Sequence, residues 1–283
     1  MHVWICGASP PGGKESMSCV ESIRTWCKGF DYTVVIVDNA SNNGSFETLE
    51  QAYQHADDIV LLRNSQNEGF ARGNNVGYRY CKRHGCDYIV TINNDAVLES
   101  GNLIPCATED YRTGEYGVIG PDIISGKTHE HQNPVTPVID SQSCAEQLNL
   151  YLRRRLWMTR LGIFPAVKKV KDKLVDSKAP VRNMSSSQKK YKLHGACLIF
   201  TLTFIEKFDE VFDPGTFLYL EEDILCIRCM RADVLMLYDS RITVLHEGDV
   251  ATNAMDKQSS RKKEITMLKR QLQSYDVLIK YFQ

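Results

Sequence analysis

The sequence predicts an α/β protein built around a mostly parallel β-sheet with helices on its faces. Short apolar stretches recur along the first half of the chain, and segments with apolar residues at helical spacing separate them. Strands buried on both faces read as continuous apolar runs, and helices between consecutive strands indicate a parallel sheet. The 283 residues are 43% hydrophobic and 24% charged, which is an ordinary globular composition.

The first half of the chain alternates predicted strands and helices in order. An apolar run at 2–8 reads as the first buried strand, and a helical pattern follows it at 18–27. The pairing then repeats, with strands expected at 32–38, 59–63 and 87–92 and helices at 46–56 and about 74–83.

The alternation breaks over 126–192 and resumes after it. A strand is expected at 194–204 and a helix within 217–233, followed by strands around "VLMLYD" and "ITVLHE". Apolar residues near helical spacing predict an amphipathic helix in the tail, 257–283. We therefore expect an α/β sheet domain with a helical insertion and a C-terminal helix.

Composition and charge narrow the functional classes. A formal net charge of −1 argues against a general nucleic-acid binder. No uncharged apolar run approaches the roughly 18 residues of a membrane span, and the start "MHVWICGASPPGG" lacks a signal-peptide pattern. The ten cysteines are then expected as reduced thiols in a cytoplasmic protein. Cys226 and Cys229 form one C-x-x-C on a predicted helix, where packing is the first interpretation and metal or redox use the alternative.

The four predicted strands of the first half all end in polar, turn-forming sequences. These are "ASPPGG" (8–13), "DNASNNGS" (38–45), "RNSQNEGFARGNN" (63–75) and "NNDA" (93–96). Each alone is explained by a turn, because Asn, Asp and Gly favour turns. Ligands of such sheets bind at the carboxyl ends of the strands, so four polar ends on one edge predict a binding surface.

Segment 151–173 is strongly basic, with eight Lys or Arg residues against one acid and with aromatic and aliphatic residues interleaved. One interpretation is a solvated face over a small satellite core. The other is an arm on an anionic membrane surface, where each basic residue contributes about 1 kcal/mol.

The ordered motifs resemble family 2 glycosyltransferases of the rhamnosyltransferase-like branch, which commonly build bacterial polysaccharides. The motifs are "VVIVDNASNNGS", "NEGFARGNNVG", "TINNDA", "HGACLIF", "FLYLEEDILCIR" and "LHEGD", and they cover about 1–125 and 194–250. The resemblance implies the GT-A (nucleotide-diphospho-sugar transferase) fold and an inverting, usually divalent-metal-dependent mechanism.

The same resemblance divides the chain into functional segments. It implies a nucleotide-sugar-binding α/β half at 1–125 and an acceptor-binding, catalytic half of the same domain at 193–250. Between them lies the basic helical and loop insertion, 126–192, which we expect to contact membrane or acceptor. The C-terminal amphipathic helix belongs to 251–283.

For the metal, the resemblance implies Asp95 and His246 as ligands of Mn²⁺ or Mg²⁺. The family's aspartate-x-aspartate motif is altered, because Asn93 takes its first position. One carboxylate suffices if diphosphate oxygens and a second protein group complete the ligand shell, and an imidazole makes Mn²⁺ more plausible. Taken alone, His246 is better explained as a satisfied histidine at a strand end, and the matched motif reverses that preference.

For the donor nucleotide, the resemblance points to residues at the polar strand ends. Asp38 matches the family's base- or ribose-binding aspartate, although a turn-forming Asp is the plain alternative. Asn93 and Asn94 are expected to hydrogen-bond ribose or phosphate without adding negative charge. Arg72 is expected on base or phosphate, with a solvent-exposed Arg as the alternative. The remaining donor-site candidates are Ala8, Ser9, Pro10, Gly69 and Asn75.

For the chemistry, the resemblance places the general base at Glu222, the second acid of the pair after "FLYL". Most relatives have Asp there, so Asp223 is the reserve candidate. Acids are also commonplace in the first turn of a helix, where the helix dipole favours them. The base would take the acceptor hydroxyl's proton while its oxygen attacks the anomeric carbon.

Together these features predict an inverting hexosyltransferase that uses a UDP- or dTDP-sugar and a glycan or lipid-linked glycan acceptor. We expect it at the cytoplasmic membrane face in polysaccharide synthesis, of capsule or O-antigen type. Two alternatives stay open at this point. A nucleotidyltransferase making the activated sugar would carry a Gly-rich basic loop, which "ASPPGGKES" imperfectly matches. A non-catalytic nucleotide-sugar-binding protein would explain Asn93.

Overall fold

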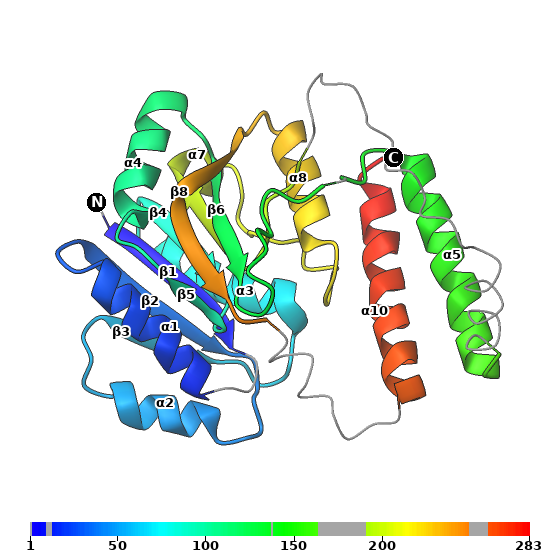
Figure 1. Cartoon of the computed structure of the whole chain (residues 1–283), viewed down its shortest axis with the longest axis horizontal. Helices are drawn as coiled ribbons and strands as arrows, with labels where there is room; N and C mark the ends of the chain where they lie inside the picture. The colour runs from blue at the N-terminus through cyan, green and yellow to red at the C-terminus, as the bar shows by residue number, and fades with distance from the viewer. Residues whose placement is uncertain (1, 10–12, 137, 164–190, 249–259) are drawn as a thin grey trace.

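The computed structural model describes residues 2–9, 13–136, 138–163, 191–248 and 260–283. Their strands form one eight-stranded sheet in the order β3-β2-β1-β4-β7-β6-β8-β5 (Figure 1). In the first half, β1 (His2–Ser9), β2 (Asp31–Asp38), β3 (Ile59–Arg63) and β4 (Tyr88–Ile92) pair with one another in parallel. The parallel half of the sheet therefore follows the predicted strands closely.

The second half of the sheet is mixed. It contains β5 (Ala96–Leu98), β6 (Val118–Ser125), β7 (Cys197–Thr201) and β8 (Met236–His246). Strand β7 is antiparallel to both β4 and β6, β5 is antiparallel to β8, and only β6 and β8 pair in parallel among these described strands. Parallel pairs still outnumber antiparallel ones in the described sheet, so the predicted mostly parallel α/β architecture is confirmed.

Strand β8 differs from the two separate strands that the sequence predicts around "VLMLYD" and "ITVLHE". It is one strand, and the turn-like residues between the two motifs lie opposite a register shift at Pro121 and Asp122 of β6. The Asp239 carboxylate accepts hydrogen bonds from the Arg241 backbone and guanidinium, so the polar residues are satisfied without ending the strand. A β-bulge absorbs the residues that looked like a turn.

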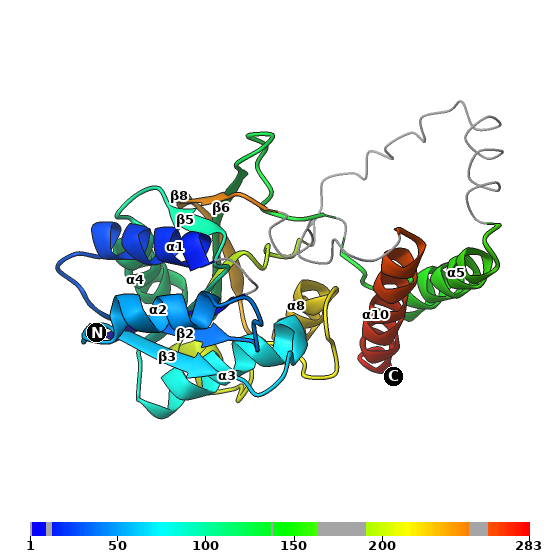
Figure 2. The ribbon, with the colours of Figure 1, turned by 90° about the horizontal axis from the view of Figure 1, so that it is seen from below.

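Helices cover both faces of the sheet, and Figure 2 shows α1 and α3 on opposite sides of it. One apolar core lies under α1 (Gly13–Trp26), α2 (Ser45–Tyr53) and α4 (Leu103–Gly114). The other lies under α3 (Gly69–Arg83), the short α7 (Leu202–Ile205) and α8 (Glu221–Arg231). Strand β2 serves both cores by alternation, because Val34 and Ile36 face the first and Val35 and Val37 the second.

Two long helices, α5 (Gln142–Leu161) and α10 (Ser260–Lys280), lie side by side away from the sheet (Figures 1 and 2). Leu152 and Leu156 of α5 pack on Leu268 and Leu272 of α10. The pair is joined to α8 by a second small cluster that contains Ala145, Ile227 and Leu278 among others. Helices α5 and α10 therefore form one satellite unit against the sheet domain.

Ion pairs reinforce this unit at its edge. Arg153 pairs with Asp276 and Arg155 with Glu264, so two basic residues of segment 151–173 are bound to α10. The four lysines of that segment lie outside the described residues. Among the helices within the described ranges, none combines the length and apolar character needed to cross a bilayer.

Candidate active site

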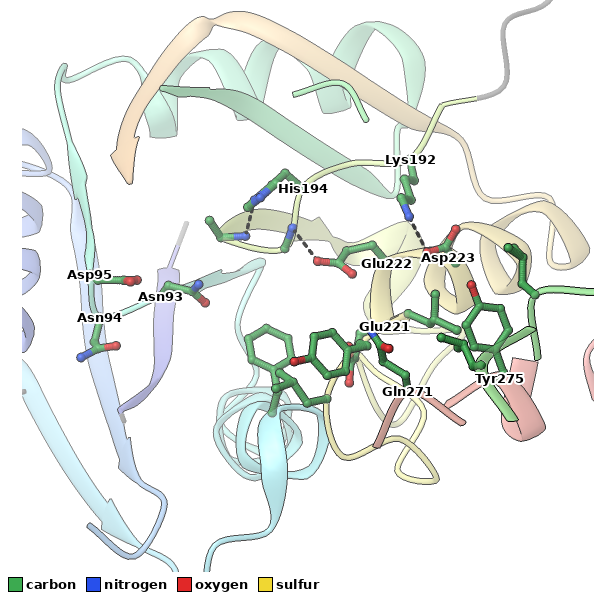
Figure 3. A pocket seen from close by; sticks show the side chains of 18 of the residues that line it. Asn93, Asn94, Asp95, Lys192, His194, Glu221, Glu222, Asp223, Gln271 and Tyr275 are labelled. Atoms are coloured by element: carbon green, nitrogen blue, oxygen red, sulfur yellow. Dashed lines mark hydrogen bonds and ion pairs between the residues drawn. The ribbon is translucent and has the colours of Figure 1, made fainter. Parts of the chain in front are cut away.

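A cavity of about 520 Å³ opens where the carboxyl end of β4 meets α8 and the α5/α10 pair (Figure 3). Three chain segments supply most of its wall, namely 93–95 after β4, 192–196 before β7, and 218–223 at the start of α8. The sheet edge, the acidic helix start and the satellite unit thus enclose one space. The other lining residues are Phe70, Leu148, Tyr151, Leu152, Gln271 and Tyr275.

Asp95 and His246 meet at one end of this region. The turn after β4 is closed by the Ala96 N–H, which donates to the Asn93 carbonyl, and β5 then pairs Ala96 with His246 of β8. Asp95 Oδ1 lies 3.4 Å from His246 Nε2, and the two side chains are only 9% and 13% exposed. The structure therefore brings together the two residues that the sequence proposes as metal ligands.

The His246 ring is held from its other side by Gln132. Its Nδ1 lies 3.1 Å from the Gln132 Oε1, so the tautomer with its proton on Nδ1 donates to that oxygen. In that tautomer the Nε2 lone pair faces Asp95. A carboxylate oxygen facing an imidazole lone pair is a donor set that Mn²⁺ or Mg²⁺ fits, with phosphate oxygens supplying further ligands. Among the described residues, no third His, Cys, Asp or Glu joins the pair.

The three acids of "EED" begin α8 after a strained turn. Tyr219 and Leu220 have φ angles of 84° and 67°, the left-handed region that costs a non-glycine residue about 1–2 kcal/mol. Such strain persists where the surroundings impose it, commonly at functional sites. The turn places Glu221, Glu222 and Asp223 along the cavity wall.

Glu222 and Asp223 have different surroundings. Glu222 Oε1 accepts the Gly195 N–H at 3.3 Å, and a side chain at Gly195 would meet that oxygen at 2.6 Å. Burial raises the pKa of Glu222. Asp223 is nearly fully buried and forms an ion pair with Lys192, and it also accepts the Ile139 N–H. Figure 3 shows Glu222 directed toward the 194–195 segment and Asp223 toward Lys192.

Glu221 is the most deeply buried acid beside the cavity that lacks a cationic partner among the described residues. It is 3% exposed, and its Oε1 has no hydrogen-bond partner among the described atoms. Burial, followed by the neighbouring Glu222 charge, raises the pKa of Glu221 to about 8. Glu221 therefore binds a proton over much of the neutral range.

His194 faces the same space and was not a candidate from the sequence. Its Nδ1 accepts the Ala196 N–H at 3.1 Å, and its ring lies 5.5 Å from the His246 ring. Burial, followed by the His246 and Lys192 charges, lowers the pKa of His194 to about 4. The neutral ring thus presents its Nε2–H as a donor.

The predicted donor-site residues divide into two groups. Asn93 and Asn94 line the cavity, and Asn94 also donates to Ser16 Oγ at 3.4 Å. Asp38 is buried at the end of β2, where its carboxylate accepts the Ser41 N–H and lies 3.5 Å from Arg63 Nε. The backbone of Ala8 and Ser9 ends β1 beside β2, and Pro10 lies outside the described residues.

Gly69, Arg72 and Asn75 form the second group and tie α3 to the 212–217 segment. Arg72 donates to the Pro214 carbonyl, and the Asn75 amide both donates to and accepts from the Phe212 backbone. Gly69 has φ +83°, and a Cβ there would lie 2.5 Å from the Phe217 carbonyl oxygen. Among the described residues that line the cavity, none of these three appears. In the structure they support the segment that leads to the acids.

Sequence reasoning missed Gln132, Lys192 and His194, and it noted Glu221 within "EED" without giving it a role of its own. Gln132 meets His246 across 114 residues, and Lys192 meets Asp223 across 31. No local pattern reports such contacts. The quoted motif "HGACLIF" does contain His194, so attention to its first residue could have found that one.

The sheet and its covering helices form the GT-A fold of glycosyltransferases, with the cavity at the carboxyl end of β4. The family model described as "Glycosyl transferase family 2" matches residues 18–165, and the chain belongs to that family. No curated protein matches the chain.

Solved structures similar to this chain share its fold at low identity. TarS 1–349 of S. aureus has a TM-score of 0.52 at 11% identity, over 87% of this chain and 60% of TarS 1–349. GalNAc-T7 with UDP, GalNAc and Mn²⁺ has a TM-score of 0.57 at 13% identity, over 87% and 44%. The mannosyltransferase PcManGT of Pyrobaculum calidifontis with GDP-Man and Mn²⁺ has 0.53 at 12% identity, over 95% and 69%. The chain thus spans about three fifths of TarS 1–349 and less than half of the GalNAc-T7 chain.

Proposed function

We propose that the chain is an inverting, divalent-cation-dependent hexosyltransferase that uses a UDP- or dTDP-sugar. The observation that carries this proposal is the facing pair of Asp95 Oδ1 and His246 Nε2, 3.4 Å apart, beside a cavity lined by Asp95 and Glu222. Relatives of similar fold were solved with UDP, UDP-GlcNAc and GDP-Man, two of them with Mn²⁺. Membership of the family favours glycosyl transfer over nucleotidyl transfer.

The proposed donor site lies on the Asp95 side of the cavity. Asp95 and His246 would hold Mn²⁺ or Mg²⁺, which when bound neutralises the charge of the diphosphate leaving group. Asn93 and Asn94 hydrogen-bond ribose or phosphate without adding charge. Ala8, Ser9, Pro10 and Asp38 are the proposed contacts of the nucleoside.

Glu222 is the proposed general base. As the acceptor oxygen bonds to the anomeric carbon, the bond from that carbon to the diphosphate oxygen breaks, and the acceptor proton passes to Glu222. One displacement inverts the anomeric configuration without a covalent enzyme intermediate. Two contacts favour Glu222 over Asp223, because Asp223 is bound to Lys192 while the Gly195 N–H orients Glu222 at the cavity.

The segment roles follow from the same assignment. We propose 1–125 as the donor-binding half and 193–250 as the acceptor-binding and catalytic half. The segments 126–192 and 251–283, which contain α5 and α10, are proposed to lie beside the acceptor. Tyr151 and Tyr275 line the cavity from that unit, and such aromatic faces suit a sugar ring. A glycan or lipid-linked glycan of a surface polysaccharide is the proposed acceptor.

The test is nucleotide release from UDP- and dTDP-sugars, with and without Mn²⁺ or Mg²⁺, by the native chain and by Glu222→Gln. We expect Glu222→Gln to lower turnover roughly 10²- to 10⁴-fold, since it removes a general base without changing side-chain size. Asp223→Asn is the matched control variant at the neighbouring acid. Turnover by Glu222→Gln at more than about half the native rate would falsify the assignment, and loss confined to Asp223→Asn would move the base to Asp223.

A further inference from the structure

Helix α5 has a face that the rest of the described chain leaves uncovered. Its buried residues recur at helical spacing and pack on α10 and α8, as Ala145, Leu152 and Leu156 show. On the opposite face the same spacing gives an outer stripe of exposed side chains. The outer stripe consists of Leu150, Arg154, Trp157 and Leu161.

The apolar members of the outer stripe are unusually exposed for their size. Trp157 is 61% exposed, Leu161 55% and Leu150 49%. Ile163, just beyond the helix, is also exposed. Scattered exposed apolar residues need no explanation, but a row of them at helical spacing with an indole at its centre marks an interaction surface.

The charge on this face has one sign. The α5 sequence contains four arginines and a single acid, Glu146, which precedes the outer stripe. The two acids of α10 are already in ion pairs with other arginines, since Asp276 pairs with Arg153 and Glu264 with Arg155. Arg154, within the outer stripe, is exposed, and so is Arg160 near the end of the helix.

We infer that the outer stripe of α5 docks on the surface of an anionic lipid bilayer. Leu and Trp side chains between arginines, on a helix lying across the surface, are the composition of an interfacial helix. Trp prefers the headgroup region, and each nearby basic residue adds to the attraction of anionic lipid. A second copy of the chain is a poorer occupant, since a stable interface buries about 800 Å² per partner and four side chains offer much less.

The position of α5 suggests what docking on a bilayer would do for the enzyme. In Figure 1 α5 is the outermost element, with α10 between it and the sheet domain. Leu148 and Tyr151 of the same helix line the cavity. Docking by the outer stripe therefore holds a helix that lines the cavity at the bilayer, where a lipid-linked acceptor would lie. This use depends on the proposed function, whereas the lipid contact itself does not.

The test is co-sedimentation of the full chain with vesicles, without any sugar substrate. We expect binding to phosphatidylcholine vesicles that contain phosphatidylglycerol, little binding to phosphatidylcholine alone, and release at high salt. Trp157→Ser and Arg154→Glu should each lower the vesicle partition coefficient about tenfold. Both side chains are exposed, so circular dichroism and nucleotide release should stay unchanged.

Matched controls come from other helices. Trp26→Ser removes an indole that is 42% exposed on α1, and Arg83→Glu reverses an exposed charge on α3. Neither should alter vesicle binding. Absence of native binding, equal loss in the controls, or binding that survives both stripe variants would overturn the inference. So would a lipid-free dimer that Trp157→Ser dissociates, because the stripe would then bind a second copy.

Discussion

At the scale of single residues, the Gln132–His246 hydrogen bond decides which imidazole nitrogen faces Asp95. Removing the acceptor frees the ring to rotate and to change tautomer. Outer-shell partners of this kind typically change metal affinity 10- to 100-fold. Gln132 therefore acts on the metal through His246 and is a positioning residue.

We expect Gln132→Leu to raise the Mn²⁺ dissociation constant about 10- to 100-fold, measured by electron paramagnetic resonance with UDP present. Gln132→Glu keeps an oxygen acceptor for Nδ1 and should retain binding. His131→Asn is the control from the adjacent position, because His131 pairs with Asp122 and its side chain is 66% exposed. Equal Mn²⁺ affinity in Gln132→Leu and the native chain would exclude this role.

The raised pKa of Glu221 predicts that the stability of the folded protein depends on pH. Its pKa rises from 4.5 in the unfolded chain to about 8 in the folded protein. A carboxyl group with a raised pKa weakens the fold as pH climbs through that window, because the unfolded state releases the proton first. Glu221→Gln should therefore raise the melting temperature above pH 8 and have little effect below pH 4.5. A pH series of thermal unfolding checks this, and a pH-independent difference would contradict it.

At the scale of elements, the sequence predicted best those strands and helices whose hydrophobic pattern lies within a single segment of the chain. The strands 32–38 and 59–63 are found as β2 (Asp31–Asp38) and β3 (Ile59–Arg63), since buried parallel strands are continuous apolar runs. The tail helix was visible from residues such as Leu268 and Leu272. Its partner was not, because the contact of α10 with α5 depends on side chains more than 100 residues apart.

The α5/α10 contact should contribute strongly to stability. Leu268 is fully buried between the two helices. Leu268→Ala should lower the free energy of unfolding by about 2–5 kcal/mol, through lost burial and the cavity left behind. Leu235→Ala is the control, because Leu235 is 58% exposed. Chemical denaturation of both variants measures the difference, and similar values would mean that the satellite unit packs loosely.

At the scale of the whole molecule, the sequence predicted the sheet architecture and the pairing of Asp95 with His246, which are 151 positions apart in the chain. The motif order carried that information. It could not supply Lys192 or Gln132, which meet Asp223 and His246 across 31 and 114 residues of chain. Composition left segment 151–173 as either a solvated face over a satellite core or an arm on a membrane, and in the structure its Arg153 and Arg155 pair with acids of α10.

The central claim is that Asp95 and His246 together hold one divalent cation beside the diphosphate. Titration of Mn²⁺ into the full chain with UDP, followed by electron paramagnetic resonance, tests it directly. The geometry predicts one tight Mn²⁺ site that Asp95→Asn and His246→Ala each abolish, while Asp122→Asn leaves it intact. Native-like Mn²⁺ binding in both ligand variants would contradict it.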